Sequence, residues 1–146
     1  MYSALSVAQY VVDYCNKYGK GISNLKLQKI LYFVQAEFLV SQHKPCFRDE
    51  IEAWDFGPVV PTVYHKYKRY GGAIIPSNSI GALYSSIDPI SSKDRSIIES
   101  IVNQGIKYSA SELVDITHNQ KPWRLSYRQG RNNVIPISLI RDYFEG

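Results

Sequence analysis

The stretch LKLQKILYFVQAEFLVSQHKPCFRDEIEAWDFGPVVP, residues 25–61, decides how this chain folds. In its first part apolar residues follow one helical stripe and also occupy the other faces: Leu27, Ile30, Leu31, Tyr32, Phe33, Val34, Ala36 and Phe38. A helix that is apolar on every face belongs in the centre of a domain. Ser23 or Asn24 can cap its start, because both side chains accept hydrogen bonds from exposed backbone N–H groups.

The second part, residues 45–61, changes character. Apolar residues alternate only partly with charged ones, and Pro45, Pro58 and Pro61 interrupt the run. This pattern favours short extended pieces over a helix, so we expect a loop or small hairpin here.

Helix signals flank this stretch on both sides. Before it, Ser6 and Gln9 fit a capping box, and apolar residues recur at helical spacing until Gly19. After it, Pro61 suits the first turn of a third helix, which ends at Gly71 and Gly72. Further helix starts are predicted at Ser91, Ser109 and Ser138.

The middle of the chain, residues 71–92, is rich in Gly, Ser, Pro and Asn. It predicts a surface loop or small hairpin, with brief strands expected at residues 74–75 and 82–84. The 146 residues suit one domain, and the 45% apolar content suffices for one core. The expected fold is mainly α: a compact single-domain helical bundle over residues 1–146, with short extended or hairpin segments near 45–60 and 73–85.

Charge and cysteine usage limit the classes of protein. The formal net charge is +4, well short of a polybasic nucleic-acid protein. Cys15 and Cys46 have no CxxC spacing, and no signal peptide opens the chain, so we expect a cytoplasmic protein. The longest apolar run is interrupted by Gln35 and Glu37, which argues against a membrane helix.

Motifs for catalysis or cofactors are missing from the sequence. His43, His65 and His118 form no zinc-binding pair, and the glycines form no phosphate-binding loop. We therefore expect no cofactor, no metal and no enzyme. One enzymatic alternative uses Cys46 or the carboxylates of residues 49–55, although charges interleaved with apolar residues more simply mark the solvent face of a strand.

Basic residues gather in three windows without acids, at residues 17–29, 65–69 and 121–131. No helix-turn-helix, zinc-finger or ribonucleoprotein signature organises them. Solvated faces or an acidic protein partner explain them better than nucleic acid, although a nucleic-acid-binding regulator remains the alternative.

Tryptophan stands in two segments that we expect to be connecting loops, at residues 52–60 and 117–123. Trp54 and Trp123 either fold back onto the core or contact a partner, since interfaces favour Trp, Tyr and Arg at their centres. Gly57 supplies a backbone angle that other residues resist.

Four segments in order carry a family resemblance. They are KLQKILYF with its helix, EAWDFGPV, the Tyr-rich residues 63–70, and THNQKPW at residues 117–123. Together they resemble the signature of the Panacea, or SocA-like, antitoxin domain, also known as a phage-associated GepA-like protein. The resemblance covers nearly the whole chain.

The resemblance implies a helical antitoxin of a type II-like toxin–antitoxin system, encoded beside a toxin gene in a bacterium, prophage or mobile element. It implies neutralisation of a cognate toxin by direct protein binding, without a catalytic site. The alternative within the family is an adaptor that delivers the toxin to a protease, and a chaperone is a further conceivable partner. Nucleic acid and membrane are not expected partners.

The residues that we expect to contact the toxin combine the aromatic and basic signals of these segments: Trp54, Phe56, Pro58, Val59, Tyr64, Tyr67, Arg69, His118, Trp123 and Arg124. No DNA-binding segment accompanies them, and residues 71–92 look individual to this chain. Toxin specificity is therefore expected from surface residues outside the shared motifs.

Overall fold

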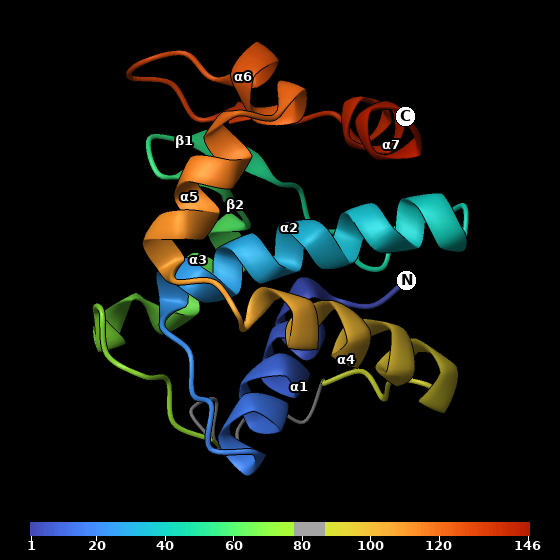
Figure 1. Cartoon of the computed structure of the whole chain (residues 1–146), viewed down its shortest axis with the longest axis vertical. Helices are drawn as coiled ribbons and strands as arrows, with labels where there is room; N and C mark the ends of the chain where they lie inside the picture. The colour runs from blue at the N-terminus through green and yellow to red at the C-terminus, as the bar shows by residue number, and fades with distance from the viewer. Residues whose placement is uncertain (78–86) are drawn as a thin grey trace.

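The computed structural model describes residues 1–77 and 87–146, and its helices surround one central helix (Figure 1). In chain order the elements are α1 (Ala4–Lys17), α2 (Asn24–Ser41), β1 (Glu52–Trp54), β2 (Gly57–Val59), α3 (Pro61–Tyr67), the 3₁₀ turn η1 (Lys68–Tyr70), α4 (Ser92–Gly105), α5 (Ala110–His118), α6 (Lys121–Ser126), β3 (Asn133–Val134) and α7 (Ile137–Glu145). The prediction of a mainly α fold is confirmed.

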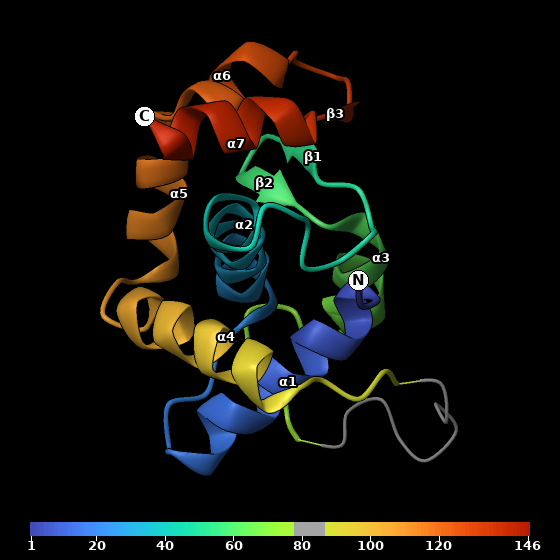
Figure 2. The ribbon, with the colours of Figure 1, turned by 90° about the vertical axis from the view of Figure 1, so that its right-hand side faces the viewer.

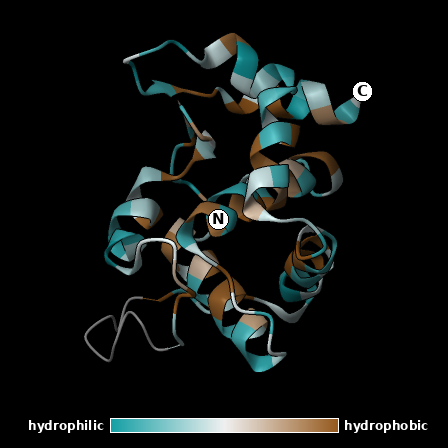
Figure 3. Cartoon of the chain, turned by 60° about the vertical axis from the view of Figure 1, so that its left-hand side comes forward, coloured by the Kyte–Doolittle hydropathy of each residue, from teal (hydrophilic) through white to brown (hydrophobic). Residues whose placement is uncertain are grey.

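Helix α2 is the centre of the domain. Figure 2 looks almost along its axis and shows α1, α3, α4, α5, α7 and the sheet around it. Its buried side chains lie on all faces and include polar ones: Asn24, Leu27, Gln28, Lys29, Ile30, Leu31, Tyr32, Val34, Gln35, Ala36, Phe38 and Leu39. The expected central helix is therefore confirmed. The surrounding helices are amphipathic, with apolar and polar residues alternating along each (Figure 3).

Strands β1 and β2 form the hairpin predicted near residues 45–60, and β3 joins them in a small antiparallel sheet. Its strand order is β2-β1-β3, with Glu52 paired to Val59 on one side and to Val134 on the other. In the second predicted segment, residues 73–77 form no strand, although the Ile75 N–H donates to the Ile22 carbonyl at 3.0 Å. The remainder of that prediction, including residues 82–84, lies outside the described residues.

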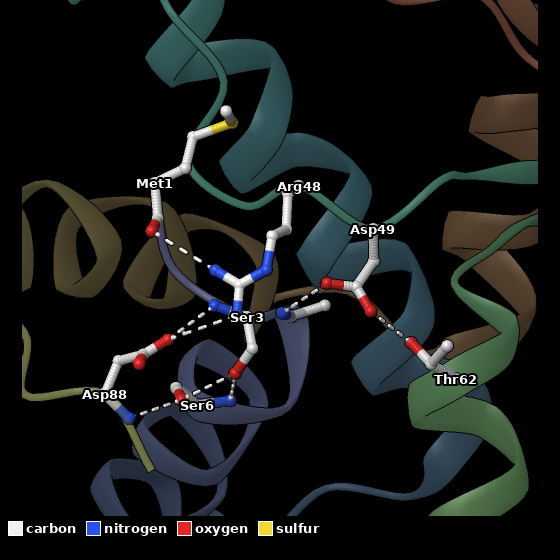
Figure 4. A network of polar contacts seen from close by, with 8 residues as sticks. Met1, Ser3, Ser6, Arg48, Asp49, Thr62 and Asp88 are labelled. Carbon is white, nitrogen blue, oxygen red and sulfur yellow. Dashed lines mark hydrogen bonds and ion pairs between the residues drawn. The ribbon is translucent and has the colours of Figure 1, made fainter. Parts of the chain in front are cut away.

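The N-terminus of α1 corrects the predicted helix start. Ser3, not Ser6, is the N-cap, because its Oγ accepts from the Ser6 N–H at 3.1 Å. Two carboxylates satisfy the neighbouring N–H groups: Asp88 accepts from Ser3 at 2.8 Å and Asp49 accepts from Ala4 at 2.9 Å (Figure 4). These long-range partners were invisible in the local sequence, so the helix begins three residues earlier than its best local capping motif suggested.

The other helix starts follow the sequence more closely. Ser23, Ser91 and Ser109 are N-caps, and Ser109 forms a complete capping box with Glu112. Helix α7 instead begins at Ile137 behind Pro136, one residue before Ser138.

Both cysteines are buried thiols that form no disulfide. Burial raises the pKa of the Cys15 thiol to about 11 and that of Cys46 to about 12. Cys15 is thus an unreactive core thiol on the buried face of α1. Within the described part of the chain, none of the helices combines the length and the apolar character needed to cross a membrane.

Candidate partner-binding surface

Buried polar side chains of α2 hold the β1–β2 hairpin and the segments on either side of it in place. The Gln28 Oε1 accepts from the Val60 N–H at 2.9 Å, and the Asn24 amide donates to the Tyr64 carbonyl at 3.1 Å. Two turns further along α2 from Gln28, Gln35 accepts from the Cys46 N–H and donates to the Phe47 carbonyl, at 2.8 and 2.9 Å. The Gln28 and Gln35 contacts are buried and the Asn24 contact is partly buried, so these side chains satisfy backbone groups that water reaches poorly or not at all.

Lys29 is the most unusual of these anchors. Its side chain is fully buried, and Nζ donates to the Pro58 carbonyl at 3.0 Å. Burial lowers the pKa of this ammonium from 10.5 to about 7. Gly57 lies against it with a φ of +102°, and a Cβ there would stand 2.8 Å from both Lys29 Cε and Thr117 Oγ1. Glycine is therefore required at this position for two reasons, its backbone angle and the close approach of Lys29 and Thr117.

Three rings from α5, α6 and the residue after α6 form a continuous stack beside the hairpin. Trp123 lies between His118, at 4.0 Å between ring centroids, and Tyr127, at 4.5 Å. The interplanar angles of 24° and 18° show that the rings are nearly parallel. Such stacking stabilises the fold beyond what the burial of the rings contributes.

Hydrogen bonds tie every ring of this stack to the β1–β2 turn. Trp123 Nε1 donates to the Trp54 carbonyl at 2.8 Å, and His118 Nε2 lies 3.0 Å from the Asp55 carbonyl. The Tyr127 hydroxyl donates to the Asp55 carboxylate, which raises the pKa of Tyr127. The turn and α6 therefore form one rigid unit, although they are far apart in sequence.

Trp54 extends the aromatic surface onto α3. Its indole meets the Tyr64 ring edge-on at a centroid distance of 5.0 Å and lies 6.1 Å from the His65 ring. The indole N–H donates to Glu52 at 2.9 Å. Through its ring and its carbonyl, Trp54 thus connects two aromatic groups.

Large apolar side chains are exposed around this framework. Phe56, at the tip of the hairpin, is 62% exposed, and Leu125 of α6 is 59% exposed. We call the whole set the aromatic surface: Trp54, Phe56, Tyr64, His65, His118, Trp123, Arg124, Leu125 and Tyr127. Exposed apolar groups beside ordered rings are typical of protein interfaces.

The structure divides the ten residues that the sequence proposed for contact. Trp54, Phe56, Tyr64, His118, Trp123 and Arg124 belong to the aromatic surface. Pro58, Val59 and Tyr67 are buried, so in this conformation they support the fold and offer a partner no contact. Arg69 lies in η1, where it donates to the Tyr70 hydroxyl at 2.9 Å.

Sequence reasoning missed Tyr127, Leu125 and the role of Asp55. Residues 117–123 were expected to form a connecting segment, whereas Thr117 and His118 end α5 and residues 121–126 form α6. Pro122 in the first turn was the available signal, because proline is favoured there.

The carboxylates of residues 49–55 do not converge on one point. Asp49 points to the start of α1 and to Thr62 (Figure 4), Glu52 accepts from Trp54, and Asp55 accepts from Tyr127. Over residues 1–77 and 87–146, His, Cys, Asp and Glu form no group of three that could hold a metal ion. Cys46 is held as a protonated thiol by burial, which disfavours a nucleophilic role.

The first basic window is likewise not a surface stripe. Lys29 is buried, and Lys26 donates to the Ile106 carbonyl at 3.2 Å. Arg124 and Arg128 of the third window are exposed beside the aromatic stack.

Comparison with known proteins identifies the family of this chain. The family described as "Antitoxin SocA-like, Panacea domain" matches residues 27–124. The chain belongs to this family. It is also 35% identical over 127 residues to the protein named Antitoxin SocA of Caulobacter vibrioides (strain NA1000 / CB15N), covering 82% of this chain and 68% of that protein. No solved structure matches the chain significantly.

Family membership gives an antitoxin role and, in general terms, a toxin partner. The region that matches the SocA-like Panacea family contains the buried anchors Gln28, Lys29 and Gln35. It also contains the hairpin and most of the aromatic stack. Within this region, Lys29 of the LQK segment (residues 27–29) binds Pro58 of the GPV segment (residues 57–59) and so connects α2 to the hairpin.

Proposed function

We propose that this chain is the antitoxin of a type II-like toxin–antitoxin system and neutralises its cognate toxin by direct protein binding in the cytoplasm. The observation that carries the proposal is its similarity to Antitoxin SocA over most of its length. The aromatic surface supports direct binding as the mode of action, because it offers exposed apolar groups on a rigid base.

Preorganisation is the physical advantage of this surface. The stack of His118, Trp123 and Tyr127 is fixed by hydrogen bonds to the hairpin, so little side-chain entropy is lost when a partner covers it. Phe56 and Leu125 then supply apolar area at the centre of the contact. Arg124 and Arg128 favour an acidic patch on the toxin and increase the association rate.

Growth assays test the antitoxin role. The open reading frame beside this gene is induced in bacteria with and without this protein expressed from a second promoter. Toxicity that co-expression relieves supports the proposal. A harmless neighbour, or toxicity that co-expression leaves unchanged, contradicts it.

Toxin abundance separates direct neutralisation from delivery to a protease. Direct binding predicts that an epitope-tagged toxin stays at the same level while growth recovers, and that the two purified proteins form a stable complex. A toxin level that falls on co-expression, and recovers when cellular proteases are deleted, identifies an adaptor instead.

A further inference from the structure

A groove of about 390 Å³ lies on a different face from the aromatic surface. Ile30, Phe33 and Glu37 of α2 form its floor, while α4, α5 and α7 supply its walls, among them Ile101, Ile116 and Phe144. In Figure 1, α4 runs below α2 and α7 above it, with α5 crossing α2 near one end. A hollow of this volume can receive a few apolar side chains from one face of a helix or of an extended segment.

The lining is apolar apart from a few groups. Glu37 is the one charged residue among the described residues that line the groove. It is half-buried, and within residues 1–77 and 87–146 no hydrogen bond or ion pair satisfies its carboxylate. The free protein tolerates this because water still reaches the carboxylate.

An occupant of the groove must therefore satisfy two conditions. It must bring apolar side chains for the walls, and it must bring a cation for Glu37, because covering a carboxylate without compensation is costly. A segment with an apolar face and a Lys or Arg on its border meets both conditions. A wholly apolar segment, or an acidic one, does not.

We propose that this groove is a second docking site on the antitoxin, and that it receives an amphipathic segment of the toxin whose Lys or Arg pairs with Glu37. The inference rests on the proposed function for the identity of the partner. It adds a separate contact whose chemistry is opposite in charge to the basic residues beside the aromatic stack. A toxin bound at both sites would contact two sides of α5, because His118 belongs to the aromatic surface and Ile116 lines the groove.

Site-specific photocrosslinking tests where the toxin lies. A benzoylphenylalanine residue replaces Tyr108, which lines the groove and is 43% exposed, in the full chain co-expressed with the adjacent gene product. The control places it at Tyr18, the residue that follows α1, which is 58% exposed and does not line the groove. We expect a crosslink from position 108 to a toxin peptide that contains apolar residues and a Lys or Arg, and none from position 18.

Charge reversal tests the pairing. Glu37→Lys is expected to weaken toxin binding roughly tenfold or more, as removal of one partner of a covered charge pair does. Glu50→Lys, the same change at an exposed loop residue, is the matched control and should retain affinity. Changing the crosslinked basic residue of the toxin to Glu should restore binding to Glu37→Lys, and equal melting temperatures exclude misfolding.

Each other result overturns the inference. A crosslink between two copies of this chain would make the groove a homodimer interface. Wild-type binding without a crosslink at position 108, or equal affinity of Glu37→Lys and Glu50→Lys, would leave the antitoxin role intact and remove the groove from it. Failure of the wild-type chain to bind the toxin would overturn the proposed function, and the groove proposal with it.

Discussion

The indole nitrogen of Trp123 donates to the backbone carbonyl of Trp54 at 2.8 Å. This bond joins α6 to the end of β1 across 69 positions of sequence, and it fixes the ring that lies in the middle of the aromatic stack. Both tryptophans therefore serve the fold and line the surface. Variants of the two residues need a stability control before any loss of binding is interpreted.

Replacing Trp123 by Phe should separate these roles. Phe keeps a ring between His118 and Tyr127 but removes the donor to the Trp54 carbonyl, so we expect a loss of about 1 kcal/mol in the free energy of unfolding. Trp123→Ala removes the ring as well and should cost about 2–4 kcal/mol. Urea denaturation measures both. Equal losses for the two variants would show that the ring contributes little beyond its hydrogen bond.

Gly57→Ala should destabilise the fold by about 2–4 kcal/mol. The new Cβ meets Lys29 and Thr117 at 2.8 Å, and φ is +102°, so steric and backbone strain add. Gly72→Ala is the control, because open space surrounds Gly72 and its φ is not in the positive region. Thermal denaturation compares the two variants. A Gly57→Ala melting temperature equal to that of Gly72→Ala would contradict the close packing of α2 against the hairpin.

The buried ammonium of Lys29 predicts a pH dependence of stability. Its pKa is about 7 in the folded state and 10.5 unfolded, so the unfolded state binds more protons between these values. The penalty for burying the charge is complete below pH 7 and is relieved as the pH rises above it. Lys29→Met has no such penalty, although it loses the bond to the Pro58 carbonyl.

Urea denaturation at pH 6, 7.5 and 9 checks this prediction. The free energy of unfolding of the wild type should rise relative to that of Lys29→Met as the pH increases. Taking the difference between the two proteins cancels the thiols and tyrosines that titrate at higher pH in both. A difference that stays constant, or that moves the other way, would show that Lys29 keeps an ordinary pKa in the fold.

The sequence predicted those features that depend on local pattern. The apolar residues of α2 predicted a central helix because they occupy every face of that helix. The partial alternation of apolar and charged residues, interrupted by prolines, predicted the hairpin near residue 52. Ser23, Ser91 and Ser109 were recognisable as caps for the same reason. Each of these signals acts between residues a few positions apart.

Features that depend on distant partners were not predictable from the chain. Ser3 caps α1 with help from Asp88 and Asp49, neither of which is near it in sequence. Likewise, Lys29 sits in a basic window but is buried under Pro58, and Tyr127 joins the stack only because Asp55 accepts its hydroxyl. Tertiary contacts decided these positions, so one-dimensional spacing misplaced them.

We propose that the aromatic surface contacts the toxin, and a variant of Phe56 tests this contact with the least disturbance of the fold. Phe56 is 62% exposed, so Phe56→Ala should change the free energy of unfolding by less than about 0.5 kcal/mol. Tyr18→Ala, at the exposed aromatic residue that follows α1, is the matched control.

The decisive measurement is the dissociation constant of the purified complex with the protein from the adjacent gene, by calorimetry, for wild type and both variants. We predict that Phe56→Ala weakens binding about tenfold or more, as loss of a central aromatic does, while Tyr18→Ala binds like wild type. Equal affinities for all three proteins, with the fold intact, would contradict the claim that the toxin docks on this surface.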